Sequence, residues 1–110
     1  MIIINGFTIK IHKKNEAGFT LHLTGDDVPA DGTLARFRVK KSPRYETVFV
    51  EKIVPIIDSS ISIDLEEDDT EYLDSGNYVW NVAILYEGQN PWTLIEPAPK
   101  FIVLPEDGGS

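Results

Sequence analysis

The fold is decided by residues 73–80, where the sequence reads LDSGNYVW. In two-layer β-sandwiches, a tyrosine at the start of a late strand often donates its hydroxyl to the backbone of the preceding corner. Tyr78 follows Gly76 at this spacing, and Leu73 is placed to fill the core beneath the corner. The alternative is an ordinary turn that leads into a strand with a buried tyrosine. Both interpretations predict a long strand over residues 77–86.

Apolar and polar residues alternate on both sides of this strand in the sequence. A period of two is typical of strands that bury one face. It predicts seven short strands, the last of them kinked by Pro97 and Pro99 and confined by these prolines to a sheet edge or a bulge. The expected strands are residues 7–12, 19–24, 34–40, 47–54, 60–65, 77–86 and 92–104. The expected core residues are Phe19, Leu21, Phe37, Val39, Ile61, Ile63, Tyr78, Trp80, Val82 and Phe101.

The fold class follows from these short strands. Only residues 66–73 could form a helical turn, because no window has the apolar spacing of an amphipathic helix. Strands at roughly ten-residue spacing predict a seven-stranded antiparallel immunoglobulin-like β-sandwich. Its first hairpin is expected to close at residues 15–18. We expect one domain over residues 1–104, followed by a flexible tail at residues 105–110.

Composition excludes several classes of protein. The 110 residues include 42 % hydrophobic and 25 % charged residues and no cysteine. These values are typical of a globular domain, and the absence of cysteine excludes disulfides, thiolate metal sites and cysteine nucleophiles. A net charge of −8 argues against nucleic acid or an anionic membrane as a partner. Without a signal-peptide pattern or a long apolar run, a cytoplasmic protein is expected.

The sequence contains no motif typical of catalysis. It has no Gly-x-Ser-x-Gly elbow and no glycine loop for phosphate, and a small sandwich with short loops offers little cleft for paired carboxylates. We therefore expect no enzymatic activity, no cofactor and no metal.

Three groups of polar residues were weighed as sites. His12 and His22 are expected diagonally on one face of the first hairpin, without the third ligand that zinc requires. The acidic run at residues 66–69 lacks the order of a calcium loop, although carboxylates pooled from neighbouring loops remain the alternative. The loop carboxylates Asp26, Asp27 and Asp31 are expected to cap backbone amides or turn the chain.

Charge is divided unevenly along the chain. Residues 1–54 carry nine basic and six acidic groups, whereas residues 55–110 carry one basic and twelve acidic groups. Arg36, Arg38 and Lys40 stand on one face of their strand. Two interpretations remain open: neighbouring strands of the same sheet neutralise this basic row, or the row meets the acidic residues 66–69 of another copy.

Residues on the face of the long strand opposite Trp80 are too apolar for a freely solvated surface. They are Val79, Asn81, Ala83 and Leu85. Such an apolar strip more often marks a contact surface. Trp92, with Tyr86 nearby, is the only aromatic pair placed to bind a sugar, and the alternative for Trp92 is that it closes a hairpin.

Four stretches of the chain carry a family resemblance. FTLHLTGDD at 19–27, ARFRVKK at 35–41, DTEYLDSGNYVWNV at 69–82 and FIV at 101–103 together resemble small immunoglobulin-like domains of phage and prophage structural proteins. Such domains occur in tail and baseplate proteins, including the N-terminal modules of baseplate upper proteins, of phages that infect Firmicutes. The resemblance covers about residues 17–103.

This resemblance implies a function but no catalytic residues. It implies a non-enzymatic structural module that works through protein–protein contacts, first in the cytoplasm of the producing bacterium and then in the virion. Its partners would be other phage structural proteins or further copies of itself. A carbohydrate-binding or adhesion module is the alternative from another class, because sandwiches also serve as a frame for sugar binding.

Overall fold

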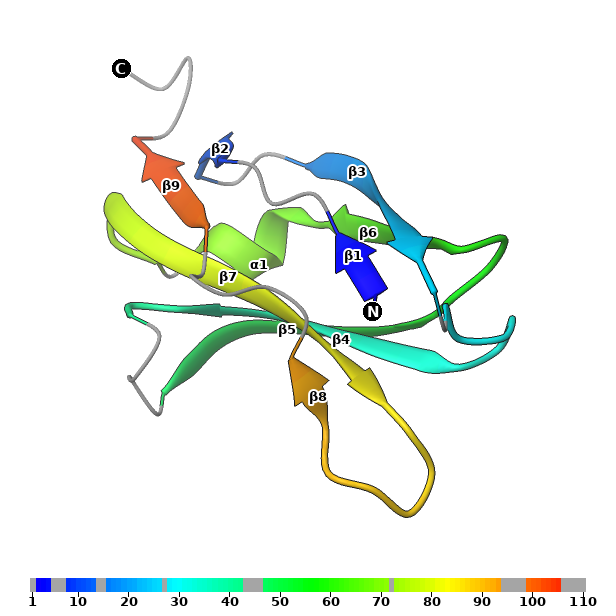
Figure 1. Cartoon of the computed structure of the whole chain (residues 1–110). Coiled ribbons are helices and arrows are strands. Elements are labelled where there is room, and N and C mark those ends of the chain that lie inside the picture. The colour runs from blue at the N-terminus through cyan, green and yellow to red at the C-terminus, as the bar shows by residue number, and fades with distance from the viewer. Residues whose placement is uncertain are drawn as a thin grey trace.

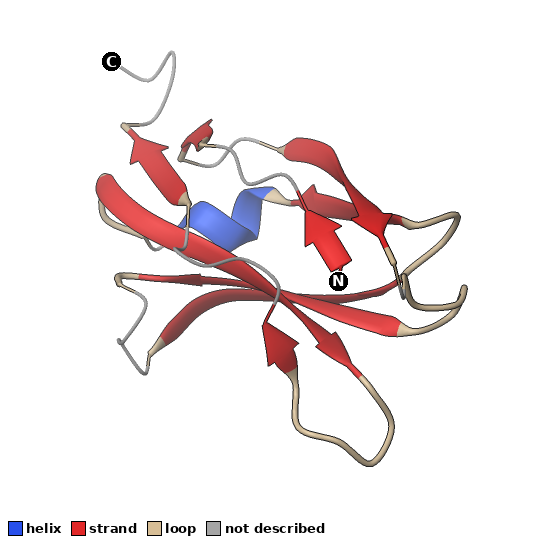
Figure 2. Ribbon diagram, in the orientation of Figure 1, coloured by secondary structure: helices blue, strands red, loops and turns tan. Residues whose placement is uncertain are grey.

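The protein is an all-β domain with one short helix (Figures 1 and 2). A computed structural model describes residues 2–4, 8–13, 16–26, 28–42, 47–71, 73–93 and 99–105. The strands in these ranges are β1 (Ile2–Ile4), β2 (Ile9–His12), β3 (Ala17–Gly25), β4 (Leu34–Lys40), β5 (Val48–Pro55), β6 (Ser60–Leu65), β7 (Gly76–Leu85), β8 (Trp92–Thr93) and β9 (Lys100–Leu104). The helix is α1 (Glu67–Glu71).

The strands form two sheets that pack in two layers. The smaller sheet has the order β1-β3-β6, and the larger has the order β2-β9-β7-β4-β5, with β8 paired to the end of β7. Figure 1 shows β1, β3 and β6 in one layer and β4, β5 and the long β7 in the other. The only parallel pair among the described strands is β2 with β9, so the larger sheet is mixed.

The prediction of seven antiparallel strands is therefore wrong in number and in direction. The N-terminal segment forms two strands, and each joins a different sheet: β1 pairs with β3, and β2 pairs with β9. The expected last strand is divided into β8 and β9, which both pair with β7. Alternation identifies a strand and its buried face, but it does not identify the neighbouring strand.

Two local predictions fail for the same reason. No hairpin joins β2 to β3, because these strands lie in different sheets. Strand β9 is not a sheet edge, since β2 occupies its second side. The prolines do not prevent this pairing, because Pro97 and Pro99 precede Lys100 and every residue of β9 keeps its backbone N–H.

The predicted core is confirmed, with Phe19 half-buried and the other predicted residues buried. Phe37 of β4 lies at its centre. Its ring centroid is 5.5 Å from that of Phe19 in the opposite sheet and 5.6 Å from that of Trp80 on β7. Offset and edge-on aromatic pairs at these distances are favourable beyond the area that they bury. Phe37 therefore links the two layers.

Candidate functional site

A tyrosine corner fixes the start of β7, one of the strands that carry the candidate surface. The Tyr78 hydroxyl donates a 2.8 Å hydrogen bond to the Asp74 carbonyl, which confirms the corner predicted from the sequence. Leu73 is buried beneath it, as expected. Burial raises the pKa of the Tyr78 phenol, and the Asp74 carboxylate raises it further. The Lys41 ammonium lies 4.6 Å from the ring centre and covers the corner.

Backbone register brings the two predicted contact sets together on the outside of the larger sheet. Arg36 lies opposite Ala83, Arg38 opposite Asn81 and Lys40 opposite Val79. Residues directly opposite in a ladder point to the same face. On the other side of β4, Ile53 of β5 lies opposite Arg36. We call this surface the basic–apolar face; its residues are Leu34, Arg36, Arg38, Lys40, Glu51, Ile53, Val79, Asn81, Ala83 and Leu85.

Exposure is unevenly divided over the basic–apolar face. Leu34 is 44 % exposed and Ile53 is 50 % exposed, whereas the three cations between β5 and β7 are half-buried. The expected apolar strip is less open than its sequence indicates, because Ala83 is buried and the other three members are half-buried. The accessible apolar area of this face therefore lies on β4 and β5.

The three cations of the face have different surroundings. Arg38 Nε is 2.7 Å from Glu51 Oε2 on β5, so a neighbouring strand neutralises this one charge. Arg36 Nε is buried without a hydrogen-bond acceptor. Burial and the adjacent Arg38 lower the pKa of Arg36, and Glu51 partly offsets this effect. Among the described residues, no ion pair is formed by Arg36 or Lys40.

Part of the acidic run is used inside the chain. Asp69 Oδ2 accepts a 2.7 Å hydrogen bond from the Glu66 N–H, and it lies 2.9 Å from Lys52 Nζ. The first contact satisfies a backbone donor at the start of α1, as the last residue of a capping box does. The Asp69 carboxylate is therefore already paired within the chain. Of the acidic run predicted to meet the basic row, this leaves the carboxylates of Glu66, Glu67 and Asp68.

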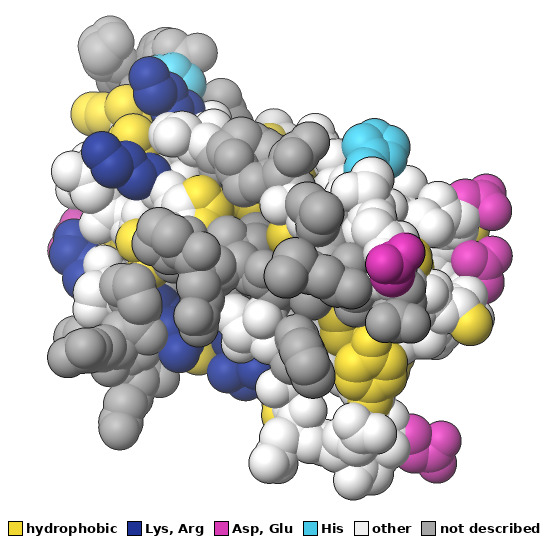
Figure 3. Space-filling model, viewed as in Figure 1, with side chains coloured by type: hydrophobic (Ala, Val, Ile, Leu, Met, Phe, Trp, Pro, Cys, Tyr) yellow, Lys and Arg dark blue, Asp and Glu magenta, His cyan; other side chains and the backbone are white. Residues whose placement is uncertain are grey.

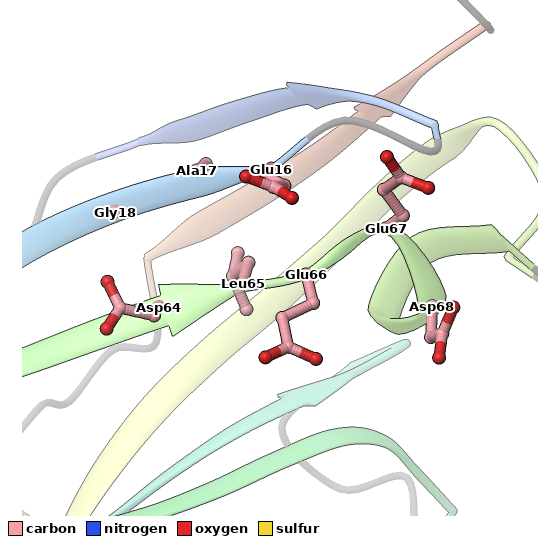
Figure 4. Close-up of a pocket in the computed structure, with 8 residues that line it drawn as sticks. All are labelled: Glu16, Ala17, Gly18, Asp64, Leu65, Glu66, Glu67 and Asp68. Atoms are coloured by element: carbon pink, nitrogen blue, oxygen red, sulfur yellow. The ribbon is translucent and has the colours of Figure 1, made fainter.

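Those other carboxylates border a concavity of about 650 Å³ (Figure 4). Figure 4 shows its side chains arriving from the start of β3, the end of β6 and the start of α1. We call it the acidic concavity; its residues are Glu16, Ala17, Gly18, Asp64, Leu65, Glu66, Glu67 and Asp68. Within the described ranges, no cluster of three or more His, Cys, Asp or Glu residues is arranged to hold a metal ion.

His12, His22 and Asp31 each make a hydrogen bond within the chain and form no shared site. His12 and His22 do not share a face: the first bonds to the Pro105 carbonyl beside the larger sheet, and the second to Ser60 on the smaller sheet. The expected juxtaposition is wrong because it assumed the absent hairpin. Asp31 accepts a hydrogen bond from the Asp58 N–H, which confirms its expected capping role. Asp27 lies outside the described residues.

Of the two residues of the sugar-binding alternative, Tyr86 lines a shallow hollow together with Leu34 and Leu85. Tyr86 is half-buried and packs against the core at the end of β7. The side chain of Trp92 lies outside the described residues, as do residues 106–110 of the expected tail.

Sequence reasoning missed Ile53 and Glu51, which complete the basic–apolar face. Both lie on the outward phase of the strand predicted at residues 47–54, and this alternation was a signal that could have identified them. Their positions beside Arg36 and Arg38 depend on the β4–β5 register, which alternation does not determine.

On the side shown in Figure 3, Lys and Arg side chains gather toward the end that holds β9, and most Asp and Glu side chains lie at the other end.

No protein-family model matches the chain, and no curated protein matches it. None of the described helices is long and apolar enough to cross a membrane.

Proposed function

We propose that this chain is a non-enzymatic immunoglobulin-like module that acts through protein–protein contacts as a structural component of a phage or prophage particle. It is made in the bacterial cytoplasm and then incorporated into the virion, in the tail or baseplate.

Topology supports the immunoglobulin-like assignment. Such sandwiches pair two sheets through connections that cross between layers, and their sixth strand begins with a corner tyrosine. In this chain β3 and β6 pair in one sheet, while β4 and β7 pair in the other. Tyr78 at the start of β7 makes the corner bond. Strand β5 widens the larger sheet beyond β4, as additional strands do in variable-type domains.

The observation that carries the contact function is the chemistry of the basic–apolar face. Leu34 and Ile53 are exposed beside Arg36, whose buried Nε has no acceptor. An adjoining protein surface can cover these apolar side chains and pair with the part of the Arg36 guanidinium that stays accessible. The assignment to a phage particle is supported by the sequence resemblance over residues 17–103.

Purification of particles tests this proposal. A tagged chain would be expressed in a bacterium that carries the gene and its phage, and particles would be separated on a density gradient. We expect the chain in the DNA-containing band at a constant ratio to the other structural proteins. A variant with Arg36→Glu and Arg38→Glu, expressed at the same level, should be depleted from that band. A chain that remains entirely in the soluble fraction would overturn the proposal.

A further inference from the structure

We infer that copies of this chain stack head to tail, with the basic–apolar face of one copy against the acidic concavity of the next. This inference deepens the proposed function, on which it rests, by naming the partner as a second copy.

The basic side of the contact is a row of cations on one strand. Arg36, Arg38 and Lys40 alternate on β4, so neighbouring members are about 6.6 Å apart along the strand. Glu51 occupies Arg38, which leaves Arg36 and Lys40 as the charges available to a partner. The Arg36 side chain is half-buried and forms no ion pair among the described residues, so a carboxylate from outside can pair with the accessible part of its guanidinium.

The acidic side offers carboxylates that are accessible. Asp64 and Glu66 are exposed, and they stand on alternate positions where β6 ends. Opposite Asp64 lies Gly18, where a Cβ atom would be only 3.1 Å from Asp64 Oδ1. The missing side chain leaves the approach to Asp64 open. Among the described residues that border the concavity, none is a lysine or an arginine.

The two sides lie on different layers of the molecule. Arg36 belongs to the larger sheet and Asp64 to the smaller, and both point away from the shared core. A contact between unlike surfaces is heterologous, so it leaves one free face at each end and continues into a ring or an open stack. Particle structures built from many copies need contacts of this kind.

The charge division explains why a second copy is a suitable partner. The chain is strongly acidic overall, but its basic residues concentrate in the half that contains β4. Complementary patches can therefore meet although whole copies repel each other at long range. Single exposed ion pairs contribute little, and the contact also requires Leu34 and Ile53 to be covered.

Sedimentation velocity with face-specific variants tests this arrangement. The basic-face variant carries Arg36→Glu and Lys40→Glu, and the acidic-face variant carries Asp64→Lys and Glu66→Lys. We expect the wild-type chain to form species larger than dimers as its concentration rises. Each variant alone should associate more weakly by about tenfold or more, since several cross-contact charges are reversed. In an equimolar mixture the two intact faces are complementary, and so are the two reversed faces, so species larger than dimers should form again.

Matched controls distinguish the effect of reversing charges on the two faces from the effect of changing the net charge of the chain. Lys10→Glu changes an exposed lysine on β2, three strands from β4, and Asp26→Lys changes an exposed aspartate beyond the end of β3. Both should associate like the wild type. Circular dichroism would verify that each variant is folded, and the neutral changes Arg36→Gln with Lys40→Gln, or Asp64→Asn with Glu66→Gln, replace any reversal that unfolds the chain.

Three results would overturn head-to-tail stacking: a wild-type chain that stays monomeric at millimolar concentration, a folded face variant that still associates fully, or a mixture that remains monomeric. A monomeric chain that still enters particles would leave the proposed function intact. A chain that stacks but never enters particles would contradict the particle role alone.

Discussion

The outer faces of the two sheets obey the same alternation but have different chemistry. On the smaller sheet the outward side chains are short and polar, and they bond to each other across strands. Thr20 Oγ1 lies 3.4 Å from Ser62 Oγ, and His22 Nδ1 lies 3.1 Å from Ser60 Oγ. On this part of the face the polar groups pair with each other within the chain.

The outer face of the larger sheet differs, because some of its side chains find no partner among the described residues. Leu34 and Ile53 are exposed on it, and Arg36 has a buried Nε without an acceptor. An alternating pattern therefore does not by itself predict that the outer face of a sheet is solvated. Side-chain size and unsatisfied donors distinguish a surface that faces water from one that is suited to a partner.

The largest effect on the free energy of unfolding is expected from a change in the core packing between the two sheets. Phe37→Ala removes the ring that contacts Phe19 across the layers and Trp80 within its own sheet. We expect the free energy of unfolding to fall by about 3–5 kcal/mol, as for other large-to-small changes of buried aromatics. Urea denaturation measures it. Leu34→Ala is the control on the same strand, and equal losses for both variants would contradict the central place of Phe37.

The next effect concerns the corner that positions β7. Tyr78→Phe removes the hydroxyl and leaves the Asp74 carbonyl without its partner. We expect a loss of about 1–3 kcal/mol in the free energy of unfolding. Tyr86→Phe makes the same chemical change at the other end of β7 and should cost less. An unchanged denaturation midpoint for Tyr78→Phe would show that the corner bond contributes nothing.

The pH dependence of stability sharpens this second test. The folded pKa of Tyr78 is raised above its ordinary value of 10.0, because burial disfavours the phenolate. Its stabilising contribution is complete below pH 10 and is lost as the pH rises through the folded pKa. The stability difference between wild type and Tyr78→Phe should therefore narrow above pH 10. A difference that stays constant over that range would contradict the assigned environment.

A smaller effect, of opposite sign, is expected in the connection between the two sheets. Asp58 and Ser59 have φ values of 50° and 58°, in the left-handed region that side chains disfavour. Two-residue turns with positive φ at both positions prefer Asp-Gly. Ser59→Gly should therefore raise the free energy of unfolding by about 0.5–1 kcal/mol. Ser62→Gly, within β6, should lower it, and destabilisation by Ser59→Gly would contradict the turn.

The smallest effect on stability is expected on the basic–apolar face itself. Ile53→Thr keeps a β-branched side chain but replaces an apolar group that is half exposed. The free energy of unfolding should change by less than about 0.5 kcal/mol, as is usual for exposed positions. Self-association measured by light scattering should nevertheless weaken, because apolar cover is lost. A large loss of stability would show that Ile53 serves the fold and not a contact.

Local sequence patterns were sufficient for the core and the corner. Inward residues such as Phe37 and Trp80 follow from alternation, and Tyr78 follows from its spacing to Gly76. Strand partners were not predictable, because β1 and β2 lie next to each other in sequence and join different sheets. Pairing over long sequence separations depends on which edges remain free after the core has formed.

The candidate surface was predictable in part. The outward phase of β4 identified the cations, and that of β7 identified the apolar strip. The sequence pattern did not show that the two sets lie opposite each other on one face. The ion pair of Arg38 with Glu51 depends on the β4–β5 register, and a register shift lies between Val39 and Lys40. Burial of Ala83 likewise depends on neighbours from other strands, which a single strand pattern does not contain.

Amide NMR spectra of the wild-type chain over a dilution series test the central claim most directly, because they report on both faces in one sample. We predict concentration-dependent shifts or broadening at Arg36, Lys40 and Ile53 on one face and at Gly18 and Asp64 on the other. Thr20 and Ser62, on the solvated part of the smaller sheet, should change little. Spectra without any concentration dependence, or with changes confined to residues outside these two faces, would contradict the account.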